Sequence, residues 1–324
     1  MYPIKRIFNP EIFQGKYRHN NYFEGWYYKI IDKVSDNIIA VIPGVAVSKS
    51  REHAFIQFID GKTGYTEYFN FPRKEFSYSD RELEIGIMHN YFTRTGMKLE
   101  LKSDNTSIYG EVTFTDIVPF PKRLWNPGIM GPFSFVPFME CHHGIINIHS
   151  RLKGFINYNG KQVDFNEGSG YVEKDWGKSF PHSWIWLQSN SFKTRDTSLM
   201  FSIASIPWLG REFDGLIAFL KLGDCFFRFA TYTGARVREL KIDERVLNIE
   251  IEDPRHVLCL KAAVGPGGML KAPKKGLMEV EITESIMSTV EARLVEKSGK
   301  LVFHDMGVNT GLELAGDFRK FATC

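Results

Sequence analysis

Short segments in which apolar and polar residues alternate dominate the chain, and this two-residue period is typical of β-strands. Where two such segments flank a turn signal, they predict a hairpin. Asn159-Gly160 is the strongest of these signals, because both residues tolerate the positive φ angles of a tight two-residue turn. The 3.6-residue period of a helix is weak throughout, so the pattern predicts a mostly β protein. The clearest candidate hairpins are residues 54–71, 154–165, 217–232 and 292–304.

The candidate strands recur in the same order in the two halves of the chain. The run "GWYYKI…AVIPGVAVS…AFIQFIDG" parallels "SWIWLQ…LMFSIASIP…IAFLKLGD", which pairs Trp26 with Trp184. Further on, "GSGYVE" parallels "VNTGLE", which pairs Glu173 with Glu313 at a smaller offset. Each half has about the size of one small antiparallel barrel. The repeat therefore predicts a duplicated barrel, with a first domain at residues 1–176 and a second at 177–324.

One segment lengthens the first half relative to the second. Residues 117–143 are dense in proline, glycine and aromatic residues. The corresponding segment, residues 263–276, is shorter and contains no aromatic residue. We interpret residues 117–143 as an aromatic insertion in the first copy of the repeat. Such a segment is suited to line or cover an apolar cavity.

Composition narrows the classes of protein. The 324 residues are 43% hydrophobic and 24% charged, values typical of a folded globular chain. The net charge of +3 is small, and no basic run alternates with aromatic residues, so we expect no nucleic-acid partner. Aromatic residues reach 14%, with 27 phenylalanines, which indicates a roomy β core or an apolar pocket.

The cysteines and the apolar runs bear on the cellular compartment. The four cysteines form no CxxC motif and no tight framework, which favours free thiols in a reducing compartment. The first 26 residues lack the apolar core of a signal peptide, and no run of 18 apolar residues occurs. We therefore expect a cytoplasmic protein.

Two carboxylates stand among tryptophans in "SGYVEKDWGKSFPHSWIWLQSN", residues 169–190. If Tyr171–Asp175 is a strand, Glu173 and Asp175 share one face. Two buried ionised carboxylates repel, so one of them keeps its proton to a higher pH, as a general acid must. The alternative is a solvated pair beside Lys174 and Lys178, and composition alone favours it.

A third carboxylate, Glu24, lies on an aromatic face with Trp26 and Tyr28 if residues 22–28 form a strand. Such a carboxylate needs a partner or a proton. An ion pair with an arginine such as Arg18 is as good an interpretation as a catalytic role.

Histidines cluster in "MECHHGIINIH", which also holds Glu140 and Cys141. His142 and His143 are neighbours, so in a strand they point to opposite faces and cannot both bind one metal ion. No tetrahedral set of ligands with the usual spacing occurs, so we expect no metal site. One of the two histidines would line the cavity. A nucleophilic Cys141–histidine pair remains open but lacks an orienting third group.

Four stretches make the chain similar to a known family. "YFEGWYYKI", "EKDWGKSFPHSWIWLQSN", "GPFSFVPFMECHHGI" and "NTGLELAGDF" resemble signatures of tocopherol cyclases, and together they reach from about Tyr22 to Phe318. The resemblance implies an all-β chain of two lipocalin-like, calycin-type barrels, related to carotenoid hydratases and AttH-type proteins. It also implies closure of a prenylated hydroquinone to a chromanol without metal or other cofactor. In that reaction an acid protonates a trisubstituted alkene, and the phenol oxygen attacks the tertiary cation.

This chemistry requires an acid away from water, walls that tolerate a cation, and a long apolar cavity. The resemblance favours Glu173 as the proton donor, with Glu24 or Asp175 tuning it, because plant members carry asparagine at the position of Asp175. Lys178 also departs from a more glycine-rich stretch in the plant members. His142 or His143 would orient or deprotonate the phenol. The expected cavity walls are Trp26, Tyr28, Phe138, Glu140, Trp176, Trp184 and Trp186.

The expected partner is a small hydrophobic ligand, prenylated or polyunsaturated, and contact with a membrane surface is possible. Two alternatives use the same cavity. One is a carrier of prenylquinones or other hydrophobic ligands without chemistry, for which the carboxylates would be unnecessary. The other is an isoprenoid hydratase, in which water captures the cation.

Overall fold

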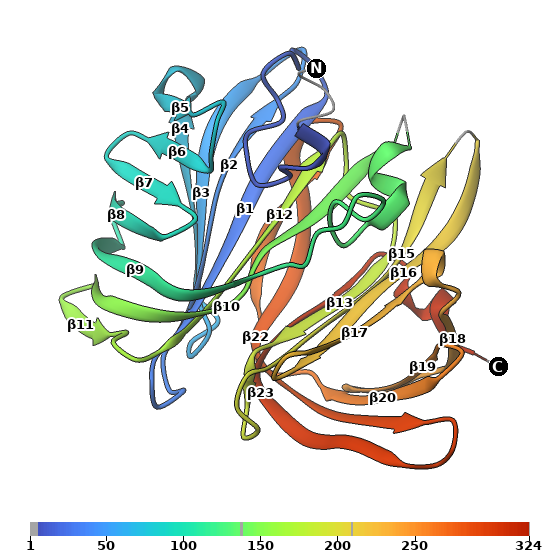
Figure 1. Ribbon diagram of the computed structural model, residues 1–324. Coiled ribbons are helices and arrows are strands. Elements are labelled where there is room, and N and C mark those ends of the chain that lie inside the picture. Colours follow the sequence, from blue (N-terminus) through green and yellow to red (C-terminus); the bar gives the residue numbers. More distant parts are fainter. Residues whose placement is uncertain (1–5, 137–138, 209, 324) are drawn as a thin grey trace. The chain divides into compact units, whose positions relative to one another are not determined.

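The computed structural model describes residues 6–136, 139–208 and 210–323, and nearly all regular structure in it is β (Figure 1). The chain divides into two compact units. The first comprises Met1–Phe180 and Met269–Glu281, and the second comprises Pro181–Gly268 and Ile282–Cys324. The predicted limits, 1–176 and 177–324, differ from these mainly because the short segment Met269–Glu281 belongs to the first unit. The short 3₁₀ helices are η1 (Arg73–Glu75), η2 (Gly131–Phe135), η3 (Thr231–Thr233) and η4 (Phe318–Phe321).

The first unit is built on one antiparallel sheet in the order β4-β3-β2-β1-β12-β10-β9-β8-β7-β6-β5, with β11 paired to β10. In Figure 1 the blue strand β1 lies beside β12, and β10 follows on the other side of β12. Its strands are β1 (Tyr22–Ile31), β2 (Ile38–Val47), β3 (Glu52–Asp60), β4 (Thr66–Pro72), β5 (Phe76–Tyr78), β6 (Glu84–Ile87), β7 (Asn90–Thr93), β8 (Gly96–Lys102), β9 (Ser107–Pro119), β10 (Cys141–Tyr158), β11 (Lys161–Asp164) and β12 (Ser169–Gly177).

The second unit has a sheet in the order β17-β16-β15-β13-β23-β22-β20-β19-β18, with β14 paired to β23. Strand β22 begins within the segment that belongs to the first unit, and it pairs with β21. The strands are β13 (Trp184–Ser189), β14 (Ser191–Phe192), β15 (Thr197–Trp208), β16 (Arg211–Leu222), β17 (Cys225–Ala230), β18 (Arg236–Asp243), β19 (Val246–Glu252), β20 (His256–Ala263), β21 (Gly268–Lys274), β22 (Leu277–Glu296) and β23 (Leu301–Ala315).

The two strand orders match, which confirms the duplicated antiparallel fold. At the centre of each sheet, β1 pairs with β12 and β13 pairs with β23. On one side follow β2 and β3, or β15 and β16. On the other side follow β10, β9 and β8, or β22, β20 and β19. Meanders of this kind are typical of antiparallel barrels.

The match of individual residues needs one correction. Trp26 and Tyr28 point into the core of the first unit, and Ile185 and Leu187 point into the core of the second. Trp184 alternates with Ile185, so it lies on the other face of its sheet. Pairing Trp26 with Trp184 was therefore wrong by one residue, and a slip of one residue exchanges the two faces of a strand.

Each unit has its own hydrophobic core. In β1 and β12, however, the face away from the core of the first unit is also buried: Tyr27 is 8% exposed, Glu173 5%, and both Lys29 and Tyr171 0%. Antiparallel sheets commonly leave one face in water. Here both faces of the central strand pair are buried, so polar residues on either face need partners or protons.

The core face of this strand pair holds a buried lysine. Lys174 forms an ion pair with Glu24, and both side chains are fully buried. The Lys174 Nζ also donates hydrogen bonds to the carbonyl oxygens of Pro10, at 2.7 Å, and Ile12, at 2.6 Å. Burial lowers the pKa of Lys174, and the charge of Glu24 opposes this effect. The pair therefore fastens residues 10–12 to the sheet.

Aromatic rings complete the surroundings of this ammonium group. The Lys174 Nζ lies 4.7 Å from the ring centre of Trp26 and 4.8 Å from that of Trp176. Both distances are typical of cation–π contacts. Glu24 accepts a hydrogen bond from the Gln14 backbone N–H, at 2.8 Å, and another from the Tyr22 hydroxyl. Glu24 is thus a structural carboxylate with a lysine partner.

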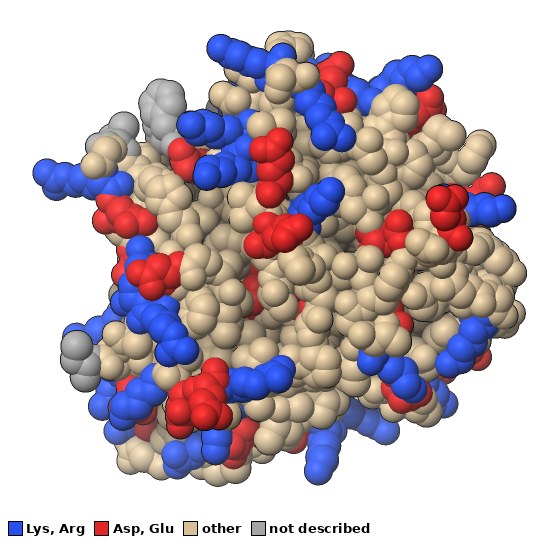
Figure 2. Space-filling model, turned by 180° about the vertical axis from the view of Figure 1, so that it is seen from behind, with Lys and Arg blue, Asp and Glu red and all other residues tan. Residues whose placement is uncertain are grey.

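Surface charge, the cysteines and the helices add little to the functional argument. On the face shown in Figure 2, lysine and arginine side chains are intermixed with aspartate and glutamate. The described cysteines, Cys141, Cys225 and Cys259, are free thiols. Within the described residues, we find no helix with the length and hydrophobicity needed to cross a bilayer.

We predict that Glu24→Gln lowers the free energy of unfolding by about 3–5 kcal/mol, because it leaves the Lys174 ammonium group buried without its counter-charge. Urea unfolding followed by tryptophan fluorescence measures the change. Lys62→Ala, which breaks the exposed Lys62–Asp36 pair, should leave the unfolding midpoint almost unchanged. The double variant Glu24→Gln/Lys174→Met should be more stable than Glu24→Gln alone. A double variant that is less stable than Glu24→Gln would contradict this account of the pair.

Candidate active site

The candidate site lies on the buried face of β12 that points away from the core of its unit. Alternation along β12 places Tyr171, Glu173 and Asp175 on this face, as the sequence pattern predicts, and Lys174 on the other. The neighbouring strands supply the rest. In β10, His143 lies opposite Asp175 in the register, and in β1, Tyr27 lies opposite Glu173. Three adjacent strands therefore build the site.

A histidine joins the two carboxylates. The His143 Nδ1 lies 2.9 Å from Asp175 Oδ1, and the His143 Nε2 lies 3.5 Å from Glu173 Oε2. Tyr171 donates its hydroxyl to the same Glu173 oxygen, Oε2, at 2.6 Å. Side-chain exposure falls along the series, from 27% for Asp175 through 14% for His143 to 6% for Glu173. The network leads from a partly wet carboxylate to a dry one.

The surroundings of Glu173 give it the properties of an acid. The pKa of Glu173 is raised to about 7, mainly by burial and also by the charge of Asp175, whereas His143, the Tyr171 hydroxyl and Lys29 oppose the rise. Near neutral pH the carboxyl group is therefore protonated in a large fraction of molecules. Burial and the charge of Glu173 raise the pKa of Tyr171 well above its ordinary value, so Tyr171 remains a hydrogen-bond donor.

The two histidines lie on opposite faces of β10, as their adjacency predicts. His142 stacks on Trp176, with ring centres 5.3 Å apart and planes inclined by 12°. Burial lowers the pKa of His142 to about 4, and the positive charges of Arg18 and Lys174 add to the effect. His142 is therefore a neutral ring on the face of Lys174. Of the two candidates, only His143 shares a face with Glu173.

Several candidate residues are not brought to Glu173. Glu24 and Trp26 lie on the core face, and the partner of Glu24 is Lys174 rather than an arginine such as Arg18. Tyr28 also points into the core, where its hydroxyl donates to the Thr93 carbonyl oxygen at 2.8 Å. Of the two expected tuning partners, Asp175 shares the face of Glu173 and Glu24 does not.

The remaining wall candidates are dispersed. Trp184 and Trp186 belong to β13 in the second unit, where the Trp184 Nε1 donates to Glu313 Oε2 at 2.6 Å. Glu140 pairs with Lys178, at 3.5 Å, and its carbonyl oxygen accepts the Lys178 backbone N–H at 2.7 Å. Trp176 is half-buried on the core face of β12, and Phe138 lies outside the described residues.

The sequence analysis did not predict the roles of two residues that act on Glu173, Tyr171 and Lys29. Tyr171 was placed on the correct face, but its hydrogen bond to Glu173 was not foreseen. Lys29 is fully buried in β1, and its positive charge acts on Glu173. Its signal was available, because a lysine inside the apolar run "WYYKII" must find partners if that strand is buried.

The three side chains of the cluster are also residue types that bind metal ions. His143, Glu173 and Asp175 each bring a potential ligand atom within 4.8 Å of the others. However, the imidazole presents one ring nitrogen to each carboxylate, as a bridge does, instead of directing both carboxylates and one nitrogen to a shared ion. The positive charge of Lys29 also opposes a cation beside Glu173. The cluster therefore fits a proton better than a metal ion.

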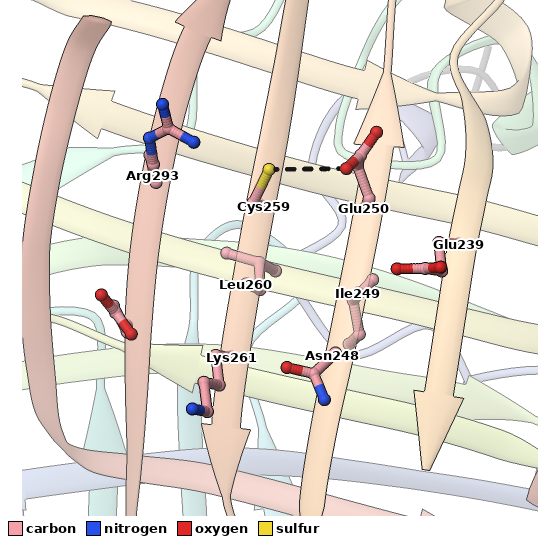
Figure 3. Close-up of a pocket in the computed structure, with 9 residues that line it drawn as sticks. Glu239, Asn248, Ile249, Glu250, Cys259, Leu260, Lys261 and Arg293 are labelled. Carbon is pink, nitrogen blue, oxygen red and sulfur yellow. Dashed lines mark hydrogen bonds between the residues drawn. The ribbon is translucent and has the colours of Figure 1, made fainter.

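A separate pocket of about 270 Å³ lies on β18, β19, β20 and β22 of the second unit (Figure 3). Glu239, Lys261 and Arg293 line it together with Ile249 and Leu260, so its wall combines apolar side chains with charges of both signs. Cys259 Sγ lies 3.8 Å from Glu250 Oε2, and burial together with Glu250 raises the pKa of this thiol. A protonated thiol is a weak nucleophile. The pocket offers no isolated acid and contains none of the predicted site residues.

Comparison with known proteins agrees with this fold. A solved structure of CghA with Sch210972 has a TM-score of 0.57 at 9% identity, covering 91% of this chain and 89% of that one. A candidate AttH from Nitrosomonas europaea has a TM-score of 0.52 at 11% identity, covering 91% of this chain and 92% of that one. These similarities confirm the expected arrangement of two lipocalin-like barrels in one chain.

Sequence comparison identifies the family. The chloroplastic tocopherol cyclase of Zea mays is 27% identical over 158 residues, which is 47% of this chain but only 32% of the maize protein. The chain thus matches about a third of the length of that relative. The model of the "Tocopherol cyclase-like" family matches residues 102–316. Since this match covers well over half of the sequence and includes Glu173, His143 and Asp175, the chain belongs to the tocopherol cyclase-like family.

Proposed function

We propose that the protein is an enzyme that adds a proton to an isoprenoid double bond and closes a prenylated hydroquinone, or a similar phenol, to a cyclic ether. The observation that carries this proposal is the buried carboxyl group of Glu173, which accepts the Tyr171 hydroxyl, lies 3.5 Å from the His143 Nε2 and has a pKa raised to about 7. Membership of the tocopherol cyclase-like family supports the same class of reaction.

In the first step, Glu173 donates its proton to the less substituted carbon of the alkene. The π bond breaks, a C–H bond forms, and positive charge develops on the tertiary carbon. A positioned general acid of this kind accelerates reactions by about 10²–10⁴-fold.

In the second step, the phenol oxygen attacks the tertiary cation, a C–O bond forms, and the phenolic proton leaves. His143 is the group placed to accept that proton, since its other ring nitrogen is held by Asp175 at 2.9 Å. The imidazole then returns the proton to Glu173 through Nε2. Substrate and product have the same atoms, so the reaction is an isomerisation in which every proton is returned.

The Asp175–His143–Glu173 series also links the acid to solvent. Asp175 is the most exposed of the three side chains and Glu173 the least. Protons from bulk water therefore exchange onto Glu173 through the imidazole between turnovers, while the carboxyl group itself stays dry. A dry site strengthens the acid's effect on the alkene, because water does not compete for its proton.

Two alternative functions, hydration of the alkene and transport of the ligand without reaction, differ from cyclisation in what is recovered from the reaction mixture. If water captures the cation, the enzyme is a hydratase and the product gains the mass of one water. If the protein only carries the ligand, the substrate is recovered unchanged. Mass spectrometry of the reaction mixture distinguishes the three outcomes.

The first prediction concerns the origin of the proton. In deuterated water, a prenylated hydroquinone should be converted to a product with one deuterium, on the carbon next to the newly formed C–O bond. Glu173→Gln should lower kcat by about 10²–10⁴-fold, because an amide does not supply the proton. Glu111→Gln, which alters an exposed carboxylate of the same unit, should retain full activity. If Glu173→Gln turns over as fast as the parent, Glu173 is not the acid.

The second prediction concerns the pH profile of kcat/KM. Activity should fall as the pH rises through about 7, because only the protonated Glu173 donates. Asp175→Asn should move the midpoint to lower pH, since a charge that raises the Glu173 pKa is lost. Tyr171→Phe should move it to higher pH, since a hydrogen bond that stabilises the carboxylate is lost. Shifts of both variants in one direction would contradict the assigned network.

The third prediction is independent of substrate. A carboxyl group with a raised pKa in the folded state binds its proton more tightly there than in the unfolded chain. Glu173 therefore stabilises the fold fully below its unfolded pKa of about 4.3, and this stabilisation is lost as the pH rises towards 7. Urea unfolding at several pH values should show that Glu173→Gln flattens the decline across this window. An unchanged slope would mean that Glu173 titrates like an exposed glutamate.

A further inference from the structure

The aromatic insertion, residues 117–143, contains an unusual turn. Arg123 and Asn126 exchange two backbone hydrogen bonds, each of 2.9 Å, so Leu124 and Trp125 are the two central residues of a tight turn. Their exposed fractions are 71% and 74%, which puts them among the most exposed large hydrophobic residues described. Two-residue turns ordinarily carry asparagine, aspartate or glycine. Leucine and tryptophan at these positions present apolar surface outward.

The turn is held in place by its base. Pro121 and Pro127 flank it and restrict the backbone on both sides. The Lys122 Nζ donates to the Phe8 carbonyl oxygen at 3.0 Å and pairs with Glu11 at 2.9 Å. These contacts anchor the base of the turn on the N-terminal segment of the same unit.

We propose that this turn, Leu124-Trp125 with Arg123 beside it, inserts into the surface of a lipid bilayer. Tryptophan and leucine at an exposed tip suit the boundary between headgroups and acyl chains. Arg123 adjoins the tip, whereas the nearest acidic residues in the sequence, Asp116 and Glu140, are at least seven residues away from it, and Lys122 is paired with Glu11. The charge directly beside the tip is therefore positive and complementary to anionic headgroups.

Two observations favour a bilayer over a protein partner. The apolar tip comprises only two side chains, whereas a stable protein interface needs about 800 Å² from each partner. Two apolar side chains beside Arg123 are enough to insert between the lipids of a bilayer, which needs no large complementary surface. Moreover, residues 263–276, the corresponding part of the second half, contain no aromatic residue, so the duplicated fold itself does not require this tip.

The insertion also connects the tip to the candidate site. It runs directly into β10, and the Met130 Sδ accepts the backbone N–H of His143 at 3.1 Å. A prenylated ligand dissolves in the bilayer, so a lipid contact on this segment would place the protein where such ligands are. The lipid contact does not depend on the chemistry proposed for Glu173 and is tested without substrate.

The test is flotation of the purified full chain with vesicles of phosphatidylcholine, alone or mixed with phosphatidylserine. The parent protein should float with the mixed vesicles. Leu124→Ser/Trp125→Ser should lower the ratio of bound to free protein by at least ~10-fold, because two apolar side chains no longer leave water. Arg123→Gln should lower it about fivefold with the mixed vesicles only. Val34→Ser, at an equally exposed turn between β1 and β2, is the matched control and should bind like the parent.

A second measurement locates the inserted residue. Trp125→Phe keeps an apolar ring and should still float. With vesicles of brominated lipids, the parent should lose part of its tryptophan fluorescence, and Trp125→Phe should lose much less. Circular dichroism checks that each variant is folded.

Four results would overturn the proposal. The parent protein does not float with either kind of vesicle, the serine double variant floats like the parent, or Val34→Ser is impaired as strongly as the double variant. A double variant that changes only self-association in gel filtration would point to a protein partner and would also overturn it. If the protein floats as expected but Glu173→Gln does not change turnover, the lipid contact stands and only the chemistry proposed for Glu173 is wrong.

Discussion

The structure depends on how the ionisable side chains of the central strand β12 are compensated, because both faces of this strand are buried. Alternation sends Glu173 to one face and Lys174, its neighbour, to the other. On the core face the ammonium group is balanced by Glu24, two carbonyl oxygens and two aromatic rings. On the other face the carboxyl group is balanced mainly by retaining its proton. The first solution gives a permanent ion pair that organises the fold, and the second gives a group able to release a proton. One strand therefore carries both the buried ion pair of the first unit and the carboxyl group of the candidate site.

Much of this arrangement is local, and local features can be predicted from a sequence. The period of two placed Tyr171, Glu173 and Asp175 on one face and separated His142 from His143, because strand geometry alone decides such relations. The duplication was also visible, since corresponding strands keep similar patterns. What could not be predicted depends on pairing between distant segments. The partner of Glu24 is Lys174 because β1 pairs with β12 across most of the first unit, and no local pattern contains that register. The same absence of register information made Trp26 and Trp184 look equivalent, although they lie on opposite faces of their strands.

Family membership and site geometry contribute different parts of the functional argument. The family match identifies what kind of protein this is, and the similar solved structures show the fold alone. The proposed acid chemistry rests on the residues themselves: a buried carboxyl group, a histidine between it and a more exposed carboxylate, and a tyrosine that donates to it. The residues that first drew attention by their composition, the tryptophans, divide between the two units and serve several purposes. Trp26 and Trp176 surround Lys174, Trp184 donates to Glu313, and Trp125 is exposed at a turn.

The segment Met269–Glu281 makes the first unit discontinuous in the chain. Gln57 exchanges two hydrogen bonds with the backbone of Lys271, at 2.7 and 3.0 Å, and Met278 packs with Phe55. A ribosome must therefore synthesise most of the second unit before the first can acquire its last strand. A chain that ended before Met269 would therefore lack one segment of the first unit. Since β22 continues from this segment into the second unit, no single cut of the chain separates the two units with all of their residues.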